Sequence, residues 1–293
     1  MEFLINFSKL TRPLSNVKNI AVVLFAFYLS GTEFDANRFI LGIVALSFIF
    51  SSLYAFNNLN DLEIDKQNDH KKHYSKAVRY FGESKIIIII FLLSIAGLII
   101  GFFINTYFLI NLIILLIIGF LYSSKISRFK EKIFLDVLFG ATLTYFFRFI
   151  ASWFIFSTFF PPLLPIIALI SAKTGGYLLY KQIDRPFLMS LNIRNSITIF
   201  ERKTLITASV FFWIITFLSF FILCLNSIYL NIKFLGSLPI KFLILLPFAV
   251  PPLVVIYFSA LHKIKTQIKY LRIIGFCYWI LVIIIIWSLF LFS

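Results

Sequence analysis

The stretch 86-IIIIIFLLSIAGLIIGFFI-104 decides the fold of this chain, because it holds nineteen consecutive residues without a single charge. A helix needs roughly 20 apolar residues to cross about 30 Å of hydrocarbon, and this stretch has that length. The whole chain of 293 residues is 61% hydrophobic and only 13% charged, which is too apolar for a surface that faces water. The bilayer is therefore the expected solvent.

Eight further apolar stretches have a comparable length. With 86–104 they predict an all-α, polytopic membrane protein, a bundle of nine transmembrane helices in a single membrane-embedded domain, residues 1–293. The expected spans are 17–31, 39–56, 86–104, 106–122, 133–157, 160–181, 204–225, 241–260 and 273–292.

The net charge of +15 raises the question of nucleic acid as a partner. Most of the 27 Lys and Arg residues, however, lie in alternate loops between the expected spans, where they set the orientation of a membrane protein. Those loops are expected on the cytoplasmic side, and no nucleic-acid partner is expected. Arg148 and Lys173 are exceptions, since both fall inside expected spans.

Cysteine and histidine patterns argue against redox chemistry and zinc. Cys224 and Cys277 lie in apolar spans, and His70, His73 and His262 have no ligand-like spacing. The N-terminus has no short apolar core with a small-residue cleavage site, so no cleaved signal peptide is expected.

The largest polar segment begins where the second span ends, at 57-NNLNDLEIDKQND-69. If the helix continues, its turn of about 100° per residue gathers six oxygen-bearing side chains on one face. Carboxylate and amide oxygens on one face suit Mg²⁺ that also binds a substrate phosphate. The alternative is a solvated helix end with mixed charges. The six side chains are those of Asn57, Asn58, Asp61, Asp65, Asn68 and Asp69.

This segment resembles the first motif of the UbiA superfamily of intramembrane prenyltransferases, N-D-x-x-D-x-x-x-D. The match is Asn57, Asn58, Asp61 and Asp65, with Asn58 in place of an Asp, which keeps an oxygen but removes a charge. The resemblance implies a nine-helix fold, Mg²⁺ held by these four residues, Asp61 and Asp65 as catalytic groups, and a polyprenyl phosphate or diphosphate as the lipid partner.

The family carries a second Asp-rich motif after its sixth span. Here Asp184 keeps one acid of that motif and Leu188 replaces another. By resemblance, Asp184 is a catalytic candidate that binds a second metal or orients the acceptor, and Lys181 contacts substrate. Tyr122 and Lys125 resemble a Tyr-Lys element of the family, although an interfacial Tyr beside Lys is also ordinary membrane anchoring.

Other short segments resemble the branch that transfers phosphoribose to a polyprenyl phosphate. They are Arg12-Pro13 with Lys18-Asn19, Lys132 with 135–138, and Arg148. A charge inside a span is costly and usually lines a polar cavity or pairs with an acid such as Asp136. The substrate-binding candidates are thus Lys18, Asn57, Lys125, Arg148, Lys173 and Lys181.

These residues support a Mg²⁺-dependent intramembrane transferase, with phosphoribosyl transfer to a polyprenyl phosphate as the preferred reaction. One alternative is prenyl transfer from a polyprenyl diphosphate to an aromatic, quinone or glycerol-type acceptor. A third hypothesis, a non-catalytic lipid-binding or transport protein, is favoured by the substitutions at Asn58 and Leu188.

Overall fold

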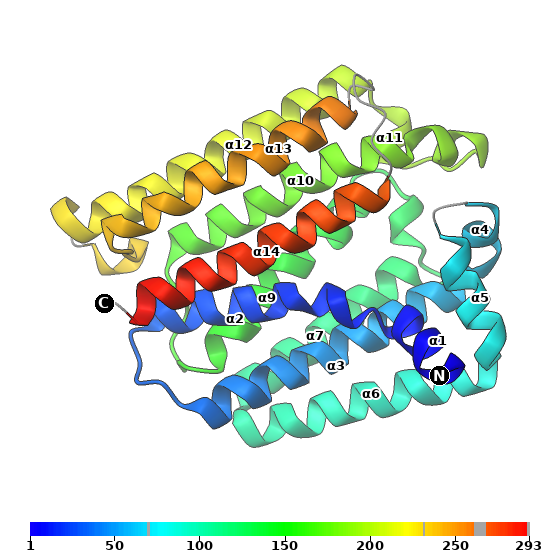
Figure 1. Ribbon diagram of the computed structural model, residues 1–293, viewed down its shortest axis with the longest axis horizontal. Helices are drawn as coiled ribbons and strands as arrows, with labels where there is room; N and C mark the ends of the chain where they lie inside the picture. The colour runs from blue at the N-terminus through cyan, green and yellow to red at the C-terminus, as the bar shows by residue number, and fades with distance from the viewer. Residues whose placement is uncertain (69–70, 231, 261–267, 292–293) are drawn as a thin grey trace.

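The computed structural model describes residues 1–68, 71–230, 232–260 and 268–291, and within these ranges it contains helices and no strands. The long helices lie side by side in one bundle, with short helices gathered at one end (Figure 1). The α-helices are α1 Glu2–Thr11, α2 Val17–Ser30, α3 Ala36–Asn60, α4 Leu62–Gln67, α5 Lys72–Phe81, α6 Glu83–Ile104, α7 Thr106–Ser123, α8 Leu135–Val137, α9 Leu143–Phe154, α10 Leu163–Ser190, α11 Ser196–Ile199, α12 Arg202–Leu225, α13 Leu245–Ala260 and α14 Ile268–Leu291.

Seven helical segments of the described chain are long and apolar enough to cross a membrane. They confirm the all-α polytopic class and cover the first seven expected spans. The count of nine is not reached among the described residues: α13 has 16 residues, and the apolar part of α14 is the shorter segment Ile273–Leu289. The segment 261–267, which includes Lys265, lies outside the described residues.

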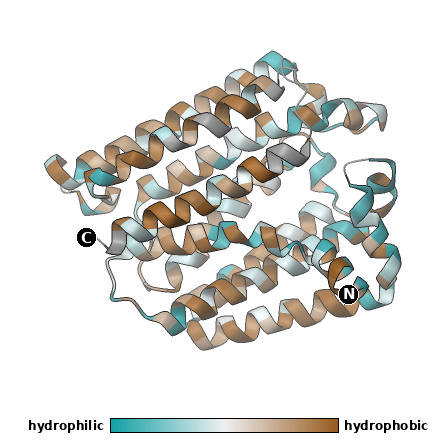
Figure 2. Cartoon of the chain, viewed as in Figure 1, coloured by the Kyte–Doolittle hydropathy of each residue, from teal (hydrophilic) through white to brown (hydrophobic). Residues whose placement is uncertain are grey.

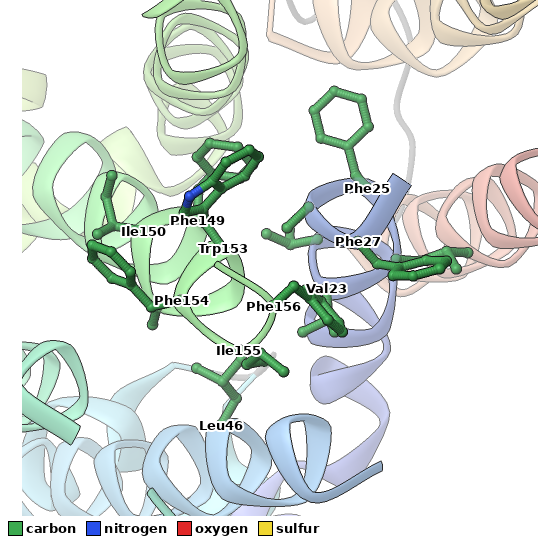
Figure 3. Packing of buried hydrophobic residues seen from close by; sticks show 14 of the residues in the cluster. Val23, Phe25, Phe27, Leu46, Phe149, Ile150, Trp153, Phe154, Ile155 and Phe156 are labelled. Carbon is green, nitrogen blue, oxygen red and sulfur yellow. The ribbon is translucent and has the colours of Figure 1, made fainter. Parts of the chain in front are cut away.

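The centre of the bundle is an aromatic and aliphatic core between α2, α3 and α9 (Figure 3). The ring centroids of Phe27 and Phe156 lie 5.3 Å apart, and those of Phe25 and Phe149 lie 6.2 Å apart. Aromatic pairs at these separations stabilise a core beyond the area they bury. This packing fixes α9, and with it Arg148, against the N-terminal half of the bundle.

Hydropathy divides the molecule into an apolar body and a polar end. The outer face of α6 exposes Ile87, Phe91 and Leu92 by more than half of their surface, as lipid-facing residues do. Figure 2 shows hydrophobic colour along the long helices and hydrophilic colour around α4, α5 and α11. The structure thus supports an integral membrane protein whose short polar helices share one end.

Two helices end differently from the sequence-based expectation. The expected continuous helix through 57–69 is interrupted at Asp61, whose ψ of 6° separates α3 from α4. Helix α10 runs to Ser190, beyond the span end expected at 181, and so Asp184 lies on a helix and not in a loop. Hydropathy placed the end of this helix too early in the sequence, because the last turns of α10 are polar but still helical.

Candidate functional site

A cavity of about 870 Å³ extends from the polar end into the bundle. It is lined by segments far apart in sequence, including η1 (Pro13–Asn16), α3, α4, the 124–134 loop, α9, α10 and α14. Eight of the ten candidate site residues line it. They are Lys18, Asn57, Asp61, Asp65, Arg148, Lys173, Lys181 and Asp184, whereas Asn58 and Lys125 do not line it.

Asp61 and Asp65 form the acidic side of the cavity. The Asp65 backbone N–H donates to the Asp61 carbonyl at 2.8 Å, so the helical turn survives the interruption and keeps the two carboxyl groups together. Both Asp65 carboxylate oxygens are buried without a hydrogen-bond partner, and Lys71 Nζ lies 3.6 Å away. Burial raises the pKa of Asp65, while the Lys71 ammonium acts in the opposite direction. A buried carboxylate without donors is the kind of group that a cation satisfies.

Lys130 is a site residue that sequence reasoning missed. Its ammonium forms an ion pair with Asp61 across the cavity wall. Burial lowers the pKa of Lys130, and the adjacent Asp61 carboxylate opposes that effect. The only sequence signal was a short basic segment, 125–132, in which nothing distinguished Lys130 from its neighbours.

The loop that carries Lys130 is held to α11 by hydrogen bonds. The Asn195 side-chain amide donates to the Lys130 carbonyl at 3.1 Å. Ser196 Oγ donates to buried Asp136 at 2.6 Å and accepts from the Phe134 backbone N–H at 2.7 Å. Phe134 has a φ of 63°, which is strained for an aromatic residue, so these bonds hold an unfavourable backbone in place.

The two amides of the first motif face different surroundings. Asn57 lines the cavity, and its Oδ1 accepts from Ser123 Oγ at 2.9 Å. Asn58 is 1% exposed, accepts from the Arg12 guanidinium and donates to the Leu10 carbonyl at 3.0 Å. Asn58 therefore joins the N-terminal segment to α3 instead of presenting its oxygen to the cavity.

Lys125 lies at a different place from the other candidates. It is exposed and lines a smaller pocket of about 680 Å³ together with Arg79 and Arg128. Tyr122, its partner in the Tyr-Lys element, does line the main cavity, where its hydroxyl lies 3.4 Å from that of Tyr177.

The second polar segment meets the first at the same cavity. On α10, Lys181 Nζ lies 3.9 Å from the Asp184 carboxylate, and both residues line the cavity with Asp61. Leu188 lines it as well, so the position of the absent second Asp is also in this wall.

A cluster of cations lies deeper, inside the spans. The Arg148 guanidinium is centred 3.7 Å from the Phe50 ring and 4.5 Å from the Tyr145 ring, and Lys173 Nζ is 4.7 Å from the Tyr145 ring. The expected alternative of pairing with Asp136 is not observed, because Asp136 accepts from Ser196. A desolvated cation–π contact contributes about 2 kcal/mol, whereas a charge at the centre of a membrane helix costs roughly 3 kcal/mol. By these magnitudes the three ring contacts are of the same order as the cost of burying the two charges.

The described residues contain no group of three or more His, Cys, Asp or Glu side chains arranged around one point. That arrangement is not required for Mg²⁺, which is usually held by one or two carboxylates together with substrate phosphates and water. The Asp65 oxygens, which have no hydrogen-bond partner, line the cavity with Asp61 and Asn57 and fit this mode of binding.

Comparison with known proteins gives one match by sequence and several by fold. The profile described as the UbiA prenyltransferase family matches residues 19–240. No curated protein matches the chain. A UbiA homologue from Archaeoglobus fulgidus, solved with GPP and Mg²⁺, has a TM-score of 0.76 and 16% identity, with 97% of this chain and 98% of that chain covered.

Two further solved structures are similar. The apo structure of a UbiA homologue from Aeropyrum pernix K1 has a TM-score of 0.70 and 17% identity, covering 94% of this chain and 96% of that one. A digeranylgeranylglyceryl phosphate synthase structure has a TM-score of 0.64 and 17% identity, covering 98% and 99%. At these identities the structures establish a shared fold.

Proposed function

The chain belongs to the UbiA prenyltransferase family, and we propose that it is a Mg²⁺-dependent intramembrane transferase that acts on a polyprenyl phosphate or diphosphate in the 870 Å³ cavity. The observation that carries this proposal is that Asp61 and Asp65, from the first acidic motif, and Asp184, from α10, line the same cavity. The Archaeoglobus homologue, which has the same fold, was solved with GPP and Mg²⁺.

The residues of the acidic wall have separate tasks. Asp61, Asp65 and Asn57 would hold Mg²⁺, which supplies positive charge to a diphosphate as it leaves. Lys71 and Lys130, already beside the two carboxylates, neutralise further charge on the phosphate oxygens. Asp184 binds a second cation or orients the acceptor, and Lys181 beside it contacts phosphate.

The apolar part of the cavity keeps water away from the reacting carbon. The bond between carbon and the diphosphate oxygen breaks, diphosphate leaves with the bonding electrons, and the acceptor forms the new bond to that carbon. An ionised phosphate oxygen attacks without losing a proton, whereas an aromatic or hydroxyl acceptor must also give up its proton. The apolar side chains of Phe50, Ile256 and Trp279 line the cavity and exclude water, which would otherwise capture the electron-poor carbon.

For the transferred group we propose phosphoribose, with a polyprenyl phosphate as the acceptor. Support comes from the Arg12-Pro13, Lys18-Asn19 and Arg148 resemblances and from Leu188 in the second motif. The competing reaction is prenyl transfer from a polyprenyl diphosphate to an aromatic, quinone or glycerol-type acceptor. Competition between phosphoribosyl diphosphate and a prenyl diphosphate as donors separates the two.

The proposed orientation places the polar end of the bundle in the cytoplasm. Segments 61–68, 71–83, 124–134 and 191–201 carry many of the Lys and Arg residues and lie at this end. A water-soluble donor such as phosphoribosyl diphosphate would then reach the acidic wall directly from the cytosol.

The decisive experiment uses the purified protein in detergent. We expect GPP or farnesyl phosphate to bind, and diphosphate to be released in the presence of Mg²⁺ and a matching co-substrate. Metal-independent binding without turnover of any donor would instead support the non-catalytic lipid-binding or transport hypothesis.

A further inference from the structure

Helices α10 and α12 pack along one seam, and this seam ends in two arginines at the polar end of the bundle. Leu178 of α10 and Leu205 of α12 belong to one buried cluster within the seam. Arg185 follows Leu178 by seven residues, which returns it to the same side of α10. Arg202 precedes Leu205 by three residues and so lies on the side of α12 that faces α10. Neither arginine lines the 870 Å³ cavity.

No acid neutralises this pair of arginines. Within the described residues, Arg185 is the one charged group that acts on Arg202, and two like charges repel. Asp184, next to Arg185 in the sequence, lies 3.9 Å from Lys181 Nζ and lines the cavity instead. Glu201 is exposed, and it is the last Asp or Glu in the sequence, so α12, α13 and α14 contribute no acidic side chain.

Both arginines hold buried nitrogen atoms without a hydrogen-bond partner. These atoms are Nη1 of Arg185 and both Nε and Nη2 of Arg202. A buried donor without an acceptor is destabilising, and most of all when it belongs to a charged group. Nε and Nη2 share one edge of the Arg202 guanidinium, which is the edge that donates two parallel hydrogen bonds to phosphate oxygens. Two cations with free donors therefore indicate an anion that accepts from both.

The position of the pair indicates where this anion comes from. Arg202 is the first residue of α12, and exposed Lys203 adds a positive charge beside it. Further along the helix, Val210, Phe211 and Ile214 are between 42% and 60% exposed, as lipid-facing side chains are. The arginine pair thus lies where a membrane span begins, at the depth of the lipid head groups. Basic pockets between membrane helices at such a level bind the head groups of anionic lipids.

We propose that Arg185 and Arg202 bind the phosphate of an anionic phospholipid at the end of the seam between α10 and α12, outside the reaction cavity. The phosphate accepts hydrogen bonds from the free nitrogen atoms of both guanidinium groups, and the acyl chains lie along the exposed apolar face of α12. A zwitterionic lipid is disfavoured, because its cationic group would meet two arginines and Lys203. This site is independent of the proposed transferase reaction.

The test is native mass spectrometry of the delipidated protein in detergent, with phosphatidylglycerol and phosphatidylcholine of the same acyl chains as probes. We expect phosphatidylglycerol to bind at least about tenfold more tightly, and Arg185→Gln and Arg202→Gln each to weaken it by about tenfold. Arg202→Lys keeps the charge but loses the planar fork, so its loss should be intermediate. Arg194→Gln, an exposed arginine at the same end, is the matched control and should bind like the wild type.

Melting temperatures without lipid separate a loss of binding from a loss of folding. Each Gln variant removes one of two repelling charges, so its lipid-free Tm should equal or exceed that of the wild type. The increase in Tm that phosphatidylglycerol produces should be smaller in both variants. A lower lipid-free Tm in both would indicate that the arginines stabilise the protein through internal contacts, which contradicts the proposal.

Three further outcomes would overturn the site or its ligand. Equal binding of the two lipids, or wild-type affinity in both Gln variants, would remove the site. An equal loss in Arg194→Gln would show an effect of net charge and not of a defined pair. Stabilisation by inorganic phosphate as large as that by phosphatidylglycerol would overturn the assignment to a lipid in favour of a soluble anion.

Discussion

Lys130 and Asp61 are 69 positions apart in the chain, yet their side chains form an ion pair at the wall of the cavity. The pair places a cation beside one of the two carboxylates of the first acidic motif. Mg²⁺ binding at Asp61 would release the Lys130 ammonium toward the phosphate oxygens, where a mobile cation is useful for charge neutralisation.

Lys130→Gln is expected to reduce Mg²⁺-dependent turnover by about ten- to a hundredfold, because one cation that faces the leaving diphosphate is lost. The matched variant is Lys125→Gln, in the same loop but exposed and outside the main cavity. Steady-state kinetics on both variants distinguish the two lysines. A larger loss for Lys125→Gln than for Lys130→Gln would favour the sequence-based assignment of Lys125 to substrate.

Asp61→Asn and Asp65→Asn are each expected to lower Mg²⁺-dependent turnover by about a hundredfold or more. Each change removes a carboxylate that would hold the metal, and with it the charge that the metal supplies to the leaving diphosphate. Glu63→Gln, on the exposed face of α4, is the control. Binding of phosphoribosyl diphosphate, or of GPP as the competing donor, titrated with Mg²⁺ gives the metal affinity of each variant. Wild-type metal affinity in both Asp variants would reject the metal assignment.

Asn58→Asp tests whether the amide at the first Asp position is a metal ligand. The Asn58 side chain contacts Arg12 and the Leu10 carbonyl, so we expect the Mg²⁺ affinity to change by less than about twofold. The same change should lower the melting temperature in detergent, because a buried carboxylate cannot donate to the Leu10 carbonyl. Metal binding that tightens strongly would instead restore Asn58 to the ligand set expected from the sequence.

Ser196→Ala removes the hydroxyl that joins Asp136 to the Phe134 backbone. Loss of the Ser196 hydroxyl as a donor to buried Asp136 should cost about 1–3 kcal/mol, which lowers the Tm by roughly 2–12 °C. Ser190→Ala, whose exposed hydroxyl bonds only within α10, should leave the Tm nearly unchanged. Equal melting of the two variants would show that the Ser196 contacts do not hold the Lys130 loop.

Topology is tested with single cysteines introduced after replacing Cys224 and Cys277 by Ala. A membrane-impermeant thiol reagent should modify Glu63→Cys and Met189→Cys from the cytoplasmic face, and Glu33→Cys from the other face, because Lys and Arg concentrate in the loops of the polar end. Modification of positions 63 and 189 from opposite faces would contradict the placement of both polar segments at one cavity.

The sequence by itself determined the class of fold and the first half of the site. Uncharged stretches such as 86–104 specify membrane helices through their own hydrophobicity, and the spacing of Asp61 and Asp65 brings both to one face through the helical repeat. Both are local properties, carried by residues within a few turns of one another. Hydropathy also found Arg148 and Lys173, since a charge inside an apolar span is conspicuous.

The tertiary structure alone decided which residues from different segments meet. The pairing of Lys130 with Asp61, the turning of Asn58 toward Arg12 and the exclusion of Lys125 from the cavity depend on how helices pack across the bundle. Asp184 reached the cavity wall because α10 continues past the apolar part of its sequence. Local hydropathy and helical period carry no information on such contacts, because they are set by packing between elements that are distant in the chain.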